Sequence, residues 1–221
     1  MYLFSTNLNR HIVKNQVLLW VLPFALLACK GEGAGKGQDN AESEKQAEVR
    51  VGQTLITDDY REKGLRYAMA VQATLAKTLQ QKIKEEGTLG AIEFCNVNAL
   101  AITDSLSREF GATISRITDR PRNPQNRATE EEMKYVEAYK EDLAEGLNAK
   151  GLVALQDDTI HFYYPIVTNS LCLKCHGTPQ SEITPEVYVK IQELYPEDRA
   201  IAYSSEQLRG LWKVSFPEEK P

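Results

Sequence analysis

The sequence predicts an α+β fold with an antiparallel sheet. Amphipathic helical segments fill the first half of the folded region, and short segments rich in β-branched and aromatic residues follow, interleaved with short helices. The 221 residues are enough for one sizeable domain with an extension. The formal net charge of −5 argues against a nucleic-acid binder, because phosphates require a basic patch.

The first 28 residues differ in kind from the rest. Residues 1–16 carry Arg10 and Lys14 and no acidic residue. Residues 17–28 are all apolar or small, a run too short to span a bilayer, which takes roughly 20 residues. A basic start followed by a short apolar core predicts a secretory signal peptide over 1–28.

Leu26-Leu27-Ala28-Cys29 is similar to a bacterial lipobox, in which the chain is cut before the cysteine. We therefore expect Cys29 to carry a lipid. Residues 29–53 begin with alternating glycines and are expected to form a flexible tether. The protein is expected to be exported and lipid-anchored to a bacterial membrane, facing the periplasm or the cell exterior.

Organised structure is expected over residues 54–217. Apolar residues from Leu65 to Ile83 recur at helical spacing, and Gly87 is a plausible stop. A second helix is expected over about 88–108, with an apolar stripe that includes Cys95. The stripe turns Cys95 toward the core.

The remaining elements follow from local signals. Residues 112–118 have the β-branched content of a strand, and the two prolines of 121–126 predict a loop. The capping box Thr129-Glu-Glu-Glu132 predicts a helix to about Glu145. The sequence predicts a hairpin of strands 151–156 and 159–167, then a helix opened by Thr184-Pro185 and a closing strand over 211–216.

The segment Cys172-Leu-Lys-Cys175-His176 carries the chemistry. A disulfide between its two cysteines would close a very short loop and constrain the chain little. A zinc site formed with Cys95 would require the adjacent residues Cys175 and His176 to bind the same tetrahedral ion. The spacing suits two thioethers to the vinyl groups of a haem, and the histidine that follows can ligate the iron. Because that attachment requires export, the signal peptide favours one covalently bound haem c.

The second axial ligand stays open on spacing alone: the candidates are His161, Met69, Met133, Cys95, water or no ligand at all. His161 is expected in a strand, and Met69 and Met133 lie among helix-facing apolar residues, where methionine is usually packing. Cys95 is either a thiolate ligand or a small buried hydrophobic residue. Arg122, in the proline-containing loop, is either a contact to a haem propionate or a solvated loop residue.

The chain resembles the family of single-haem c-type sensor domains with a PAS-like fold, first catalogued as a domain of unknown function. The resemblance covers about residues 57–216. It rests on these segments: Gly90–Asn96, Arg122–Asn126, Tyr164–Thr168, Cys172–Gly177, Tyr195–Asp198 and Arg209-Gly210. It implies a PAS-like antiparallel sheet wrapped by helices, with covalent haem ligated by His176 and Cys95.

The resemblance and the site together imply a membrane-tethered haem sensor of redox state or of a small ligand, signalling to a separate protein partner. The alternative is a monohaem electron-transfer cytochrome that docks to redox partners. An enzyme such as a peroxidase would need an open distal site with an acid–base residue. Because the resemblance implies that both axial positions are filled, we expect no enzymatic activity.

Overall fold

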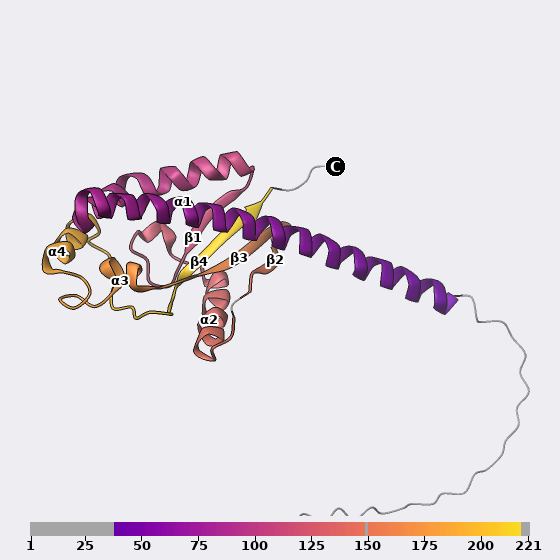
Figure 1. The fold of residues 1–221 in the computed structure, drawn as a ribbon. Helices are drawn as coiled ribbons and strands as arrows, with labels where there is room; N and C mark the ends of the chain where they lie inside the picture. The colour runs from indigo at the N-terminus through magenta and orange to yellow at the C-terminus, as the bar shows by residue number, and fades with distance from the viewer. Residues whose placement is uncertain (1–37, 149, 218–221) are drawn as a thin grey trace, which may run out of the picture. The chain divides into compact units, whose positions relative to one another are not determined.

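The computed structural model describes residues 38–148 and 150–217 of the chain. It confirms the predicted α+β class, because helices pack against one antiparallel sheet as expected for a PAS-like fold (Figure 1). The strands lie in the order β1-β4-β3-β2, so the last strand of the chain occupies the middle of the sheet. Their bounds are Thr113–Ile117 for β1, Leu152–Gln156 for β2, Thr159–Val167 for β3 and Leu208–Phe216 for β4.

Helix α1, Gln38–Phe110, is interrupted at Gly87, whose φ of 71° and ψ of −176° are not helical. Glycine adopts such a conformation at no steric cost, which explains the predicted stop. The chain reverses there, and the second segment of α1 runs back beside the first (Figure 1). Lys82 before the break lies 5.4 Å from the ring of Phe94 after it.

The helix begins at Gln38, whereas we expected the folded region to begin near residue 54 and the tether to extend to residue 53. Residues 38–53 contain no aromatic residue but include three glutamates, three glutamines and two alanines, which are strong helix formers. The predicted signal peptide 1–28 and the predicted lipidation site Cys29 lie outside the described residues.

The two faces of the sheet are covered differently. Phe162 and Trp212 pack against Ala68 and Val71 of α1 on one face. On the other face the sheet packs against helix α2, Glu130–Ala144, through residues such as Tyr163, Leu211, Val136 and Tyr139. The predicted capping box of α2 is formed, with both reciprocal hydrogen bonds between Thr129 and Glu132.

Two short helices follow the hairpin of β2 and β3, whose turn residues Asp157 and Asp158 have φ of 47° and 58°. They are α3, Ser170–His176, and α4, Pro185–Leu194. Ile183, Val187 and Ile191 pack with Ile92 of α1 in a third apolar cluster, with Cys175 at its edge. None of the helices in the described part of the chain has an apolar stretch long enough to cross a membrane.

Candidate cofactor site

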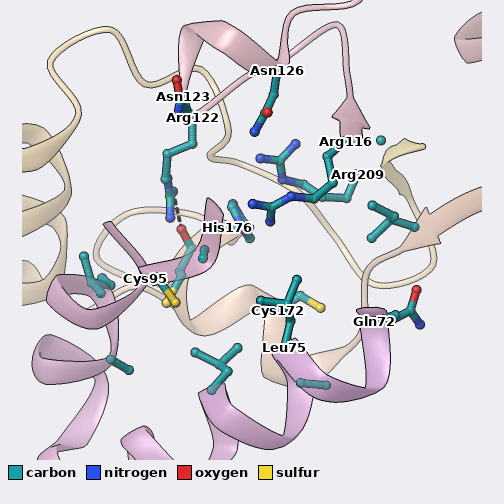
Figure 2. Close-up of a pocket in the computed structure, with 18 of the residues that line it drawn as sticks. Gln72, Leu75, Cys95, Arg116, Arg122, Asn123, Asn126, Cys172, His176 and Arg209 are labelled. Atoms are coloured by element: carbon teal, nitrogen blue, oxygen red, sulfur yellow. Dashed lines mark hydrogen bonds between the residues drawn. The ribbon is translucent and has the colours of Figure 1, made fainter. Parts of the chain in front are cut away.

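A cavity of about 300 Å³ lies where both segments of α1 meet β1, β4 and α3 (Figure 2). That volume is at the lower end of the range for small-molecule sites. Most of its wall is apolar, from residues such as Leu75, Leu79, Ile92, Ile166 and Trp212. The polar and sulfur-bearing side chains in the wall include Cys95, Arg116, Arg122, Asn123, Asn126, Cys172, Cys175, His176 and Arg209.

Helix α3 presents the attachment motif to this cavity. Asn169 caps the helix, and its side-chain oxygen accepts from the backbone N–H of Leu171 at 3.0 Å and of Cys172 at 3.3 Å. Residues three and four apart share a helix face, so Cys172 is aligned with both Cys175 and His176. All three residues line the cavity. This helix is absent from the elements predicted above, although Asn169 is a typical N-cap residue.

His176 is held in one tautomer. Its Nδ1–H donates to the carbonyl oxygen of Ala200 at 2.7 Å, because a carbonyl can only accept. The Nε2 atom therefore keeps its lone pair, the form in which histidine binds metals. Burial lowers the pKa of His176 well below its usual value, and the positive charges of Arg209 and Arg122 lower it further. The imidazole is neutral at pH 7.

Cys95 lines the same cavity from the second segment of α1, as its place on the predicted stripe requires. Burial raises the pKa of the Cys95 thiol, and the nearby charges of Arg116 and Arg122 oppose that shift. Burial likewise raises the pKa of Cys175 to about 11. Without a metal both groups are thiols at neutral pH, and a bound metal ion would deprotonate the one that ligates it.

The other residues considered as axial ligands lie elsewhere. His161 donates to or accepts from Ser215 Oγ at 2.8 Å and does not line the cavity. Met69 is exposed on α1, and Met133 packs in the cluster between the sheet and α2. Among the described residues, Cys95 and His176 are therefore the two candidate ligands that the fold brings to one cavity.

The disulfide and zinc alternatives are not formed in this structure. Cys95, Cys172 and Cys175 are all free thiols. Within residues 38–148 and 150–217, no three histidine, cysteine or acidic side chains lie close enough together to bind a metal ion.

Arg122 lies in the cavity wall, but one of its nitrogens is committed to the protein. Its Nη2 donates to the carbonyl of Cys175 at 2.6 Å, to Asp198 Oδ2 at 3.1 Å and to the carbonyl of Ala200 at 3.3 Å. The side chain thus joins the end of α3 to the segment that fixes His176. The predicted contact to a propionate stays a prediction, and this bracing role is one that sequence reasoning missed.

Arg116 and Arg209 are the other site residues that sequence reasoning missed. Arg116 lies on β1 opposite Trp212 of β4, and its guanidinium is 5.7 Å from the Trp212 ring. Arg209 belongs to the Arg209-Gly210 segment of the family resemblance, which assigned it no role. The sequence holds one weak signal for Arg116. It is an arginine within a β-branched segment, on the same face of the strand as the apolar Ile114.

The chain is similar to known proteins of one family. A crystal structure of the cyanobacterial heme-protein Tll0287 is similar, with 19% sequence identity and a TM-score of 0.47 over 69% of this chain and 96% of that one. No curated protein matches the chain significantly. The family model for Tll0287-like proteins matches residues 38–217. The match spans most of the sequence, so the chain belongs to the Tll0287-like family, as its motifs predicted.

Proposed function

We propose that this protein binds one haem c, attached through thioethers to Cys172 and Cys175, with His176 and Cys95 as axial ligands of the iron. The observation that carries the proposal is the capped helix α3, which presents two sulfurs and a neutral imidazole to an apolar cavity that Cys95 also lines. Membership of the Tll0287-like family supports this proposal, because Tll0287 is described as a cyanobacterial heme-protein.

The residues of the cavity suit these roles. A bound haem would supply a redox-active iron with two axial positions. The lone pair of His176 Nε2 is available, because Nδ1 is occupied by Ala200. A thiolate at Cys95 would favour the ferric state by donating electron density. Arg116 and Arg122 would stabilise that thiolate, since both charges already favour ionisation of Cys95.

We propose that the protein senses redox state or a small ligand through Cys95. Cys95 would be the more labile of the two ligands, because a ferrous iron would hold a thiolate less strongly than a ferric one and a protonated sulfur would no longer ligate. Cys95 lies on the second segment of α1, eight residues past the break at Gly87 in the sequence. Release of the sulfur would therefore free that segment to shift relative to the sheet and transmit a signal to a protein partner.

The ligand set is tested by low-temperature electron paramagnetic resonance of the ferric protein. We expect low-spin signals of the thiolate type in the wild type and their loss in Cys95→Ser. Val97→Ser is the matched control, because Val97 lies on the same helix but is 72% exposed. Thiolate signals that persist in Cys95→Ser would refute the assignment of Cys95.

Sensing is separated from electron transfer by adding carbon monoxide or nitric oxide to the reduced protein. A sensor with a labile ligand should bind the gas and change its visible spectrum. An electron-transfer cytochrome should keep both axial ligands on reduction, show no change with the gas and exchange electrons rapidly. An unchanged spectrum would therefore favour the electron carrier.

We also propose that the protein is exported and anchored to a membrane by a lipid on Cys29. The support is the sequence of residues 1–29 alone. Expression of wild-type and Cys29→Ser chains, followed by membrane fractionation and mass spectrometry, tests it. We expect the wild type in the membrane fraction with a lipid-modified N-terminal cysteine, and Cys29→Ser outside it. Equal distribution of the two would refute the anchor.

A further inference from the structure

Two guanidinium groups in the cavity wall form no ion pair within residues 38–148 and 150–217. Arg116 comes from β1 and Arg209 from β4, and Figure 2 shows both side chains extending into the cavity beside His176. Neither forms an ion pair with any residue that the structure describes; the charge of Asp198 reaches Arg209, but that carboxylate is paired with Arg122. Burial lowers the pKa of Arg116 and lowers that of Arg209 to about 10, so both remain charged at neutral pH.

The hydrogen bonds of Arg209 leave one edge of its guanidinium open. Its Nη1 donates to Thr118 Oγ1 at 3.4 Å and to the carbonyl of Arg120 at 3.3 Å, which fixes the orientation of the group. Its Nε is buried and has no acceptor among the described residues. The Nε and Nη2 edge is the one that receives a carboxylate through two parallel hydrogen bonds.

Arg116 is also held in place without its charge being neutralised. Its guanidinium lies over the ring of Trp212, and the Trp212 Nε1–H donates to Gln72 Oε1 at 3.0 Å, which fixes the ring. The groups whose negative charge reaches Arg116 are Cys95 and Tyr195, neither of which is ionised here at neutral pH. An unpaired buried charge is costly, so two such cations at one cavity call for an anionic occupant.

We infer that Arg116 and Arg209 form the carboxylate-binding pair of the cavity and hold the two propionates of the haem. This inference rests on the proposed function. The ion pair separates the three cavity arginines: Arg122 is paired with Asp198 and donates to two backbone carbonyls, although its Nε, like that of Arg209, is buried without an acceptor. Arg116 and Arg209 have no such carboxylate within the described residues, which leaves their charge for the cofactor. Two carboxylates also balance the two positive charges.

The test uses protein made with haem whose propionate carboxyl carbons are labelled with carbon-13. Infrared difference spectra between the oxidised and reduced protein then isolate the propionate bands, and a redox titration of the same samples gives the reduction potential. We expect Arg116→Gln and Arg209→Gln each to shift the labelled bands. Each should also lower the potential, because removing a positive charge near the iron disfavours the added electron.

Arg127→Gln is the matched control. It removes the same charge from the same end of the sheet, but Arg127 is exposed and lies outside the cavity wall. Its labelled bands should match the wild type, and its potential should change less. Arg209→Lys separates geometry from charge: we expect shifted bands with a potential close to that of the wild type. This variant also keeps the test decisive where a glutamine variant fails to fold.

Labelled bands that are the same in the wild type, Arg209→Lys and both glutamine variants would overturn the inference. It would also be overturned if added acetate changed the visible spectrum of the wild type but not of Arg209→Gln, with the labelled bands unmoved, since the pair would then bind a free carboxylate. A denatured chain without haem absorption would instead refute the proposed function, so the two failures are distinguishable.

Discussion

Replacing Arg122 with methionine should destabilise the protein strongly, because Arg122 braces the motif that carries His176. The Nη2 of Arg122 donates to three acceptors from two segments: Cys175, Asp198 and Ala200. The ion pair with Asp198 is well shielded, since the Arg122 side chain is 12% exposed and that of Asp198 is 7% exposed. Methionine keeps much of the volume and removes every donor.

The expected loss is about 3–5 kcal/mol of unfolding free energy, the usual effect of removing one partner from a buried pair. Asp198 would keep its hydrogen bond from the backbone N–H of Ala200 at 2.8 Å but would lose its cation. In the double variant Arg122→Met, Asp198→Asn no buried charge is left unpaired. We therefore expect it to recover about 1–3 kcal/mol relative to the sum of the single losses.

The assay is urea denaturation of the purified protein followed by circular dichroism, in a double-mutant cycle. Lys190→Met is the comparison, because Lys190 pairs with the 62% exposed Glu193 at 2.8 Å and should contribute less than about 1 kcal/mol. If Arg122→Met costs no more than Lys190→Met, or the cycle shows no coupling with Asp198, the bracing role is wrong.

Three further outcomes follow from single contacts. A Cβ at Gly64 would lie 2.3 Å from the ring of Phe162, so Gly64→Ala should lower the unfolding free energy by about 1–3 kcal/mol in urea denaturation. Burial alone would raise the pKa of Glu132, but Lys213 and the helix cap hold it below its usual value. The stability this gives is present above about pH 4.5 and is lost as the pH falls through the lower folded pKa, so Glu132→Gln should flatten the acid side of a stability–pH curve. Asn169→Ala removes the cap of α3 and should cost about 1 kcal/mol in thermal unfolding, whereas Asn169→Ser should restore most of it.

Local signals predicted most of the fold. Gly87, the Thr129 capping box and the Asp157-Asp158 turn each act through neighbouring residues, and the structure confirms all three. The predicted start of the folded region, near residue 54, is wrong, because the tether predicted from the alternating glycines was extended over residues that form part of α1. Helix propensity, which does not depend on apolar content, favours a helix there.

Part of the site could also be predicted from signals between residues that are close in the sequence. Cys172, Cys175 and His176 are adjacent in the sequence, and Cys95 lies on a visible apolar stripe. The roles of the arginines depend on strand register and on loops far apart in the chain. The pairing of Arg116 with Trp212, for example, joins β1 to a strand that begins more than ninety positions later. No local pattern specifies such a contact.

The carbonyl of Ala200 links the support of the site to the strength of its ligand. It accepts from His176 Nδ1 at 2.7 Å and from Arg122 Nη2 at 3.3 Å. A cation at the same oxygen withdraws electron density, so it weakens the hold of the carbonyl on the imidazole proton and makes Nε2 a weaker donor to a metal. Arg122 therefore fixes the position of His176 while lowering its basicity. A variant that loses this guanidinium should make the histidine less ordered and more strongly donating at once, two effects that a purely structural brace would not combine.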